Sequence, residues 1–169
     1  MPIAHGLGMG LESATGGGRR SVTATTGSVT DAATVTIAKT ARFETREANE
    51  TILLDKLAID GSITLITQGV GGNAAIVNAA QVDLAASDIG GTLNVTATTG
   101  GITDSGMTLV ADTAVFTTQQ IGQSIFLDLL GVTGTIALQT AVDGDATIVN
   151  KTSIDFASST VGGNLSATA

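Results

Sequence analysis

The chain has 169 residues, of which 43% are hydrophobic and only 2% are aromatic, and its formal net charge is −8. Four Phe without Tyr or Trp indicate a thin, regular core of Ala, Val, Ile and Leu rather than the aromatic-rich core of an ordinary globular enzyme. The acidic balance speaks against a general nucleic-acid binder and against docking on an anionic membrane. The lack of cysteine excludes disulfides, thiolate metal sites and a Cys nucleophile.

The charge is unevenly distributed. Residues 1–60 hold six of the seven basic residues, whereas residues 61–169 hold only Lys151 against eight Asp. No apolar run approaches the ~20 residues of a membrane helix, so we expect no membrane insertion. Residues 1–10 lack the basic and apolar regions of a signal peptide, so an export signal would have to lie outside this chain.

An internal repeat is the strongest signal in the sequence. Residues 22–67 align with residues 95–140 at an offset of 73, with 21 identities in 46 positions. Residues 70–97 align with residues 142–169 at an offset of 72, with 14 identities in 28. We therefore divide the chain into an irregular Gly-rich N-terminal arm, or degenerate first coil, at residues 1–17 and a repeat region at residues 18–169. The copies span about 18–90 and 91–162, and a third begins at 163.

A shorter motif lies within each copy. The pattern apolar-x-Gly-x-apolar-x-apolar starts at six positions: Ile59, Val70, Ile89, Val132, Val142 and Val161. Apolar residues alternate at steps of two, which predicts strands, and the Gly before each strand supplies φ freedom for a corner. The ninth motif position is always small or polar, and we expect its side chains to lie on the outside of the molecule. These residues are Thr67, Asn78, Ala97, Thr140, Asn150 and Ala169.

Residues 38–58 allow a second interpretation, because they contain helix formers and mixed charges that could form an amphipathic capping helix. The later copy of this segment predicts strands and turns, so we favour strands for both copies.

Short strands with one apolar side must stack to bury that side. We expect about eight strands per 72-residue unit, three strands per coil and coils of roughly 20–25 residues, stacked at ~4.8 Å. The sequence therefore predicts an all-β fold, a parallel β-helix or solenoid of about six to seven coils with a 72–73-residue super-repeat. An antiparallel β-sandwich is the competing fold.

The sequence offers no convincing catalytic, cofactor or metal site, and we predict none. His5 is the only histidine and lies in the Gly-rich arm. Three Asp pairs recur through the repeat, and stacked carboxylates could bind calcium or act as a glycosidase pair. Equivalent residues would lie about three coils, or ~14 Å, apart, which is too far for a glycosidase pair, so we expect Asp at turns and on the solvated face. The pairs are Asp31/Asp104, Asp55/Asp128 and Asp83/Asp155.

Threonines in T-x-T units, such as Thr23-x-Thr25 and Thr96-x-Thr98, raise the alternative of an ice-binding face. The clear match recurs only once per 73 residues, whereas an ice face needs one in every coil, so β-propensity explains the threonines better.

The stretches GGTLNVTATTGGITDSG at Gly90–Gly106 and VDGDATIVNKTSIDFASSTVGGNLSATA at Val142–Ala169 resemble repeats of filamentous-haemagglutinin-like bacterial exoproteins, the adhesins of two-partner secretion, and of autotransporter passengers. The resemblance covers about residues 18–169. It implies a right-handed β-helical stalk on the bacterial cell surface that carries adhesive regions to host cells, matrix or neighbouring bacteria.

We therefore expect a non-catalytic stalk or interaction segment of a large extracellular adhesin, with no cofactor and no nucleic-acid partner. The alternatives are a polysaccharide-acting enzyme on the same scaffold and a self-assembling or ice-binding solenoid that associates end to end.

Overall fold

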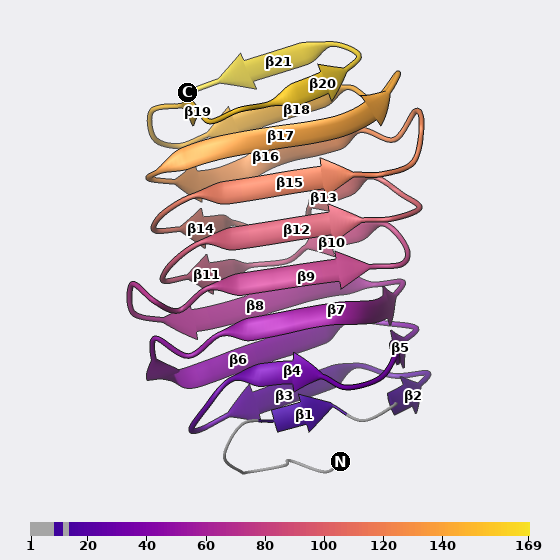
Figure 1. Cartoon of the computed structure of the whole chain (residues 1–169), viewed down its shortest axis with the longest axis vertical. Helices are drawn as coiled ribbons and strands as arrows, with labels where there is room; N and C mark the ends of the chain where they lie inside the picture. The colour runs from indigo at the N-terminus through magenta and orange to yellow at the C-terminus, as the bar shows by residue number, and fades with distance from the viewer. Residues whose placement is uncertain (1–8, 12–13) are drawn as a thin grey trace.

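The computed structural model describes residues 9–11 and 14–169, and in this part of the chain every regular element is a β-strand. The strands form two sheets that face each other across the core (Figure 1). The front sheet, nearer the viewer in Figure 1, contains β1 (Met9–Leu11), β2 (Ala14–Gly16), β4 (Val29–Asp31), β5 (Val35–Ile37), β7 (Ile52–Ile59), β9 (Ala74–Asn78), β12 (Leu93–Ala97), β15 (Ala114–Thr118), β17 (Thr135–Val142), β19 (Asp155–Phe156) and β20 (Thr160–Gly162).

The back sheet completes the coils. It contains β3 (Arg20–Ala24), β6 (Ala41–Ala48), β8 (Ser62–Gln68), β10 (Val82–Leu84), β11 (Ser87–Ile89), β13 (Ile102–Asp104), β14 (Thr108–Val110), β16 (Ile125–Val132), β18 (Ala146–Asn150) and β21 (Leu165–Thr168).

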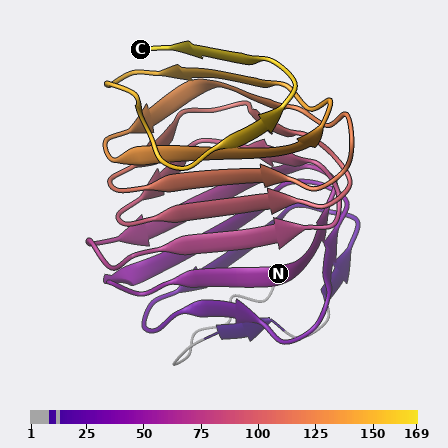
Figure 2. The same cartoon turned by 45° about the horizontal axis from the view of Figure 1, so that its top comes forward.

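The chain winds from one sheet to the other and back, so that each coil lies on the previous one. All pairings between the described strands are parallel, and equivalent positions lie about 21 residues apart over about seven turns. Figure 2, tilted towards the C-terminal end, shows each coil as a flattened loop with two long sides. The predicted parallel β-solenoid of six to seven coils is confirmed, and the antiparallel sandwich is wrong.

Each coil has two sides rather than three. One side of a coil is either a single strand, such as the eight-residue β7, or two short strands, such as β10 and β11. Both short strands pair with the same long neighbour, because β10 and β11 each lie against β8. The predicted three strands per coil therefore describe only the coils in which one side is divided.

The core is a single column of small aliphatic side chains between the sheets. Alternate residues of each strand point inward, as in β9, where Ala74, Ile76 and Asn78 are buried and Ala75 and Val77 are partly exposed. Two phenylalanines, Phe43 and Phe116, are the largest fully buried side chains and occupy equivalent positions in the two copies. Each coil has room for little more than one layer of Val, Ile or Leu, which explains the low aromatic content.

The side chains at the ninth motif position were expected on the outside of the molecule, and the structure corrects this expectation. Thr67, Asn78, Thr140 and Asn150 are buried, with at most 8% of each residue exposed, and Ala97 is fully buried. Ala169 alone among the six is exposed, as expected. The reason is the two-residue period: the ninth position has the same parity as the inward apolar residues at positions five and seven. Polarity suggested an outward direction here, but strand geometry places these side chains in the core.

The 72–73-residue repeat corresponds to three and a half coils, not three. Each strand of the first copy has its equivalent in the opposite sheet: β3 lies in the back sheet and β12 in the front, and β9 lies in the front and β18 in the back. Successive copies are therefore related by a half-turn about the rod axis together with a translation of ~17 Å, taken from the coil spacing. Two copies complete seven whole coils.

Residues 38–58 form no helix; they contain β6 and most of β7, in agreement with the favoured strand interpretation. In the segment expected to be an arm or degenerate coil, the structure describes β1 and β2, which pair with β4 and β5. His5 lies outside the described residues.

Candidate functional site

The repeated buried polar residues close the corners of the solenoid. The amide of Asn78 lies against Ile59 of the preceding coil: Oδ1 accepts from the Ile59 N–H, and Nδ2 donates to the Ile59 carbonyl, both at 2.8 Å. Nδ2 also donates to the Gln81 carbonyl at 2.7 Å. Asn150 makes the same bonds to Val132 and Ser153 in the second copy. These amides are occupied by the backbone and are not free to bind a ligand.

Two buried threonines perform a similar function. The Thr67 hydroxyl donates to the Gly72 carbonyl at 2.5 Å and accepts from the Gly90 N–H at 3.1 Å. The Thr140 hydroxyl repeats this arrangement with Gly144 and Gly162. Each threonine thus joins its own corner to the corner of the next coil.

The first Asp pair also binds the backbone. Both carboxylate oxygens of Asp31 accept from the N–H groups of Asp55 and Lys56, at 3.1 and 2.7 Å. Asp104 accepts in the same way from Asp128 and Leu129 at 3.0 and 2.9 Å. Asp31 and Asp104 lie in opposite sheets, so they cannot form one carboxylate pair. The expected bonding to the backbone is observed, but Asp31 is buried rather than on the solvated face, because its carboxylate reaches the backbone of the next coil. The separation of the pair also includes a half-turn that the estimate of three coils omitted.

The two copies differ electrostatically at this position. Burial raises the pKa of Asp104, the N–H groups of Leu129 and Asp128 oppose this shift, and the nearby Asp128 charge raises the pKa further. In the first copy, Lys56 lies where the second copy has Leu129, and its ammonium donates to Asp55 at 2.9 Å. This hydrogen bond and the Lys56 charge lower the pKa of Asp55. The cation is thus present in one copy only.

The other Asp pairs do not form a site either. Asp55 and Asp128 are exposed in β7 and β16, which belong to opposite sheets. Asp83 accepts from the Ser105 hydroxyl at 3.0 Å, while its equivalent Asp155 lies in the front sheet. Within the described part of the chain, no three His, Cys, Asp or Glu residues are arranged to hold a metal ion.

The motif glycines are required by close packing rather than by φ. Among the described residues, the glycines with positive φ are Gly27, Gly69 and Gly122, and none of these is a motif glycine. A Cβ on Gly72 would instead lie closer than 3.0 Å to the backbone of Gln68. The same holds for Gly61 against Lys39. The explanation from φ freedom was wrong, and the contact between neighbouring corners replaces it.

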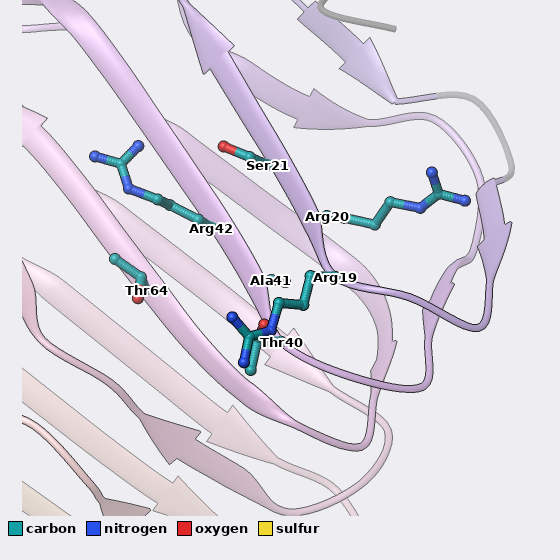
Figure 3. Close-up of a pocket in the computed structure, with 7 residues that line it drawn as sticks. All are labelled: Arg19, Arg20, Ser21, Thr40, Ala41, Arg42 and Thr64. Carbon is teal, nitrogen blue, oxygen red and sulfur yellow. The ribbon is translucent and has the colours of Figure 1, made fainter. Parts of the chain in front are cut away.

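A shallow hollow of about 350 Å³ lies on the N-terminal coils of the back sheet (Figure 3). It is lined by Arg19, Arg20, Ser21, Thr40, Ala41, Arg42 and Thr64. In Figure 3 the guanidinium groups of Arg20 and Arg42 point away from each other, and only Arg19 reaches towards Thr40. The described lining includes no Asp or Glu. The hollow is therefore basic, but its cations do not converge on one point.

Arg42 also forms an ion pair with a neighbouring carboxylate. Its guanidinium donates to Glu44, two residues along β6, and Arg46 lies 3.4 Å from the same carboxylate. The Arg42 hydrogen bond holds the pKa of Glu44 below its ordinary value, against a smaller opposing effect of burial. Both arginines keep their side chains partly or largely exposed, and ion pairs whose cations remain in solvent contribute little to stability.

The sequence analysis did not identify a set of exposed apolar residues that recurs in both copies. Leu53 and Phe126 are equivalent positions with 53% and 50% exposure, and Val70 and Val142 are equivalent with 89% and 64%. The repeat alignment could have identified these residues, because each pair is apolar in both copies. The strand period places Leu53 and Phe126 outward, and Val70 and Val142 lie at or next to turns. The half-turn puts the members of each pair on opposite sides of the rod.

Comparison with known proteins adds one finding. Residues 71–141 match the model of a family described as repeats of unknown function (DUF5649). The match covers 71 residues, about the length of one copy, and ends inside β17. No match was found among curated proteins or among solved structures. The described residues contain no helix that is long and apolar enough to cross a membrane.

Proposed function

We propose that this chain is a structural stalk segment of a large extracellular bacterial adhesin and that it is not an enzyme. The observation that carries the proposal is the use of the repeated polar residues. Asn78, Thr67 and Asp31 bind the backbone of a neighbouring coil, and so do their equivalents Asn150, Thr140 and Asp104. The buried Thr45 and Thr118 bond within their own corners instead. What the repeat preserves is the connection between coils, and a stalk needs this property.

The interior supports the same proposal. One uninterrupted core cluster runs from Ala24 to Ile148, and the backbone ladders continue beside it in both sheets. A load along the rod axis would be shared by both ladders and by the buried side chains. The resemblance to haemagglutinin-like repeats adds the cell-surface location and the adhesive context to the proposal.

The alternatives have less support. A polysaccharide-acting enzyme needs carboxylates together with cations in a groove, whereas the described lining of the hollow has cations only. An ice-binding face needs threonine in every coil, but the outward row through Thr96 and Thr117 has Val77 on one side and Gln139 on the other.

A replacement experiment in the parent protein would test the stalk proposal. Residues 20–164, which form seven coils, would be deleted in frame or replaced by an unrelated β-solenoid of equal length. We expect deletion to reduce attachment of the bacteria to cells or matrix and the replacement to restore it, because a stalk acts through its length. Labelling of intact cells with an antibody against this chain would test the location.

Three results would contradict the proposal. Attachment that the replacement fails to restore would show a role for this particular surface. Antibody labelling only after permeabilisation would exclude the cell-surface location. Depolymerisation of acidic or neutral polysaccharides by the purified chain, at a rate proportional to its concentration, would support the enzyme instead.

A further inference from the structure

The two edges of the flattened rod carry different charges. The front-to-back edge, on the right in Figure 1, consists of the corners at which the chain leaves the front sheet for the back sheet. Its successive corners are residues 17–19, 38–40, 60–61, 79–81, 98–101, 119–124, 143–145 and 163–164. Hydrogen bonds join neighbouring corners, as from the Gly163 N–H to the Gly144 carbonyl, and the Gly122 N–H of the sixth corner donates to Val142 at the end of β17, both at 2.9 Å.

Opposite charges lie at the two ends of this edge. The first two corners carry Arg19 and Lys39, with Arg20 at the start of β3, and all three are exposed. The third corner carries the exposed Asp60, so this end of the edge keeps a formal charge of +2 (three cations and one carboxylate). The seventh corner carries Asp143 and Asp145, which are also exposed. The second and seventh corners are five coils apart, or ~24 Å at the coil spacing. This distance exceeds the Debye length of ~8 Å at physiological ionic strength, so the two groups do not neutralise each other within one chain.

The fourth, fifth and sixth corners are uncharged. The fourth corner is Ala79–Ala80–Gln81, and the fifth is Thr98–Thr99–Gly100–Gly101. The sixth corner adds the exposed apolar residue Ile121, and Val142 directly precedes the seventh. The fourth and fifth corners of two rods could approach each other closely without desolvating a charge.

A two-fold axis through this middle matches the opposite charges. With the axis between the fourth and fifth corners, the second corner of one rod faces the seventh corner of its neighbour. Lys39 then faces Asp143 and Asp145, and Arg20 lies within the reach of one coil from them. The same contacts recur at the other end, since an interface of this symmetry is self-complementary. Charge complementarity therefore selects a second copy of this chain as the partner.

We propose that two copies of this chain associate side by side and antiparallel through their front-to-back edges. The inference goes beyond the stalk function, because it assigns a lateral partner rather than an axial one. The complementary groups are exposed, so the association is weak, depends on salt and rests on several charges acting together.

The opposite edge offers a poorer match. It carries Glu50, Asp112 and Lys151 in separate corners, so like charges are not grouped along it. A parallel arrangement in which the front-to-back edge meets this opposite edge makes a different prediction, which the same experiment can detect.

Cysteine cross-linking of the full chain would test the arrangement, since the natural sequence has no cysteine to interfere. Ala79→Cys places an exposed thiol in the middle of the front-to-back edge, and Ala111→Cys is the matched exposed alanine in the opposite edge. With a short bismaleimide at low salt, we expect A79C to give a covalent dimer, A111C to give almost none, and a mixture of the two to give no mixed product. Sedimentation equilibrium of the unmodified chain should show a dimer that dissociates as salt is added.

A charge reversal would test the electrostatic basis. In the A79C background, R20E/K39E should lower the cross-linking rate about fivefold or more at low salt. The control R46E/K151E changes the net charge equally outside this edge and should leave the rate within about twofold of the parent. Thermal melts would confirm that both variants are folded.

A chain that sediments as a monomer at all concentrations and salts would overturn the proposal and leave the stalk function untouched. Equal cross-linking of A111C, a mixed A79C–A111C product, or equal effects of the two double reversals would also overturn it.

Discussion

Asn78 and Asn150 make the same hydrogen bonds on opposite edges of the rod. Asn78 ends β9 in the front sheet and binds Ile59, whereas Asn150 ends β18 in the back sheet and binds Val132, with each Oδ1 2.8 Å from the backbone nitrogen. One corner sequence therefore closes both kinds of edge. This is possible because the flattened coil has two similar sides, and it allows a copy to occupy three and a half coils.

Replacing Asn78 by Leu should lower the free energy of unfolding by about 3 kcal/mol. The change leaves the Ile59 N–H and the Ile59 and Gln81 carbonyls without their partner in a buried corner, where each unsatisfied group costs about 1–3 kcal/mol. Urea denaturation would measure the loss. Asn94→Leu, the same change at an exposed position of β12, should stay within about 0.5 kcal/mol of the parent. Equal effects of the two variants would contradict the structural role of the Asn78 amide.

Thr108→Val should stabilise the protein by about 1 kcal/mol, unlike most core substitutions. The Thr108 hydroxyl is buried without a hydrogen-bond partner in the described structure, and the equivalent residue of the first copy is Val35. Thr67→Val is the matched control, because the Thr67 hydroxyl is also buried but bonds to Gly72 and Gly90, and its loss should cost about 1–2 kcal/mol. Shifts of the same sign in the two urea midpoints would refute the assignment.

The fold was predictable because it depends on local period and on repetition, both of which are visible in one chain. The alternation in β8, β9 and β12, together with the recurring glycines, indicated stacked parallel strands. The half-turn between copies could not be predicted, because it depends on how many residues each side of a coil takes up. β7 spans a side alone, while β10 and β11 share one.

The direction of polar side chains was the main error. Thr67 and Asn78 were expected outside because they are polar. Inside, however, they form hydrogen bonds with backbone N–H and C=O groups at the corner, and these bonds offset the cost of burying a polar side chain. Parity along the strand predicts the inward direction correctly, and polarity does not.

The opposite charges of the front-to-back edge could not be predicted from the sequence. The sequence showed only that basic residues are concentrated in the first 60 residues, whereas the coil lengths determine which charged residues lie on the same edge.

Gly72→Ala should destabilise the protein more than Gly122→Ala. An added Cβ at Gly72 would collide with the Gln68 backbone, which cannot move without disturbing β8, so we expect a loss of about 3 kcal/mol. Gly122 has φ +74° but open space around its Cα, so alanine there should cost only about 1 kcal/mol of backbone strain. Thermal unfolding of both variants would rank them, and the reverse order would show that conformation rather than contact selects the glycines.

Leu129→Lys should stabilise the second copy at neutral pH and lose this effect in acid. The pKa of Asp104 is raised in the folded protein, mainly by burial, so its charged form costs stability above that pKa, and the cost disappears as the pH falls through it. A lysine at 129 reproduces Lys56 of the first copy, which lowers the pKa of Asp55.

The added cation should favour the charged carboxylate of Asp104, which lowers its folded-state pKa relative to the parent. The gain of L129K over the parent should therefore be fully present above the raised folded-state pKa of Asp104 in the parent and vanish as the pH falls through the lowered value in the variant. Because the site is only half-buried, we expect a gain below about 1 kcal/mol at pH 7. Urea titrations of both proteins between pH 3 and 7 would measure the difference. Leu129→Gln controls for loss of the leucine, and a gain that does not vary with pH would show that packing rather than charge is responsible.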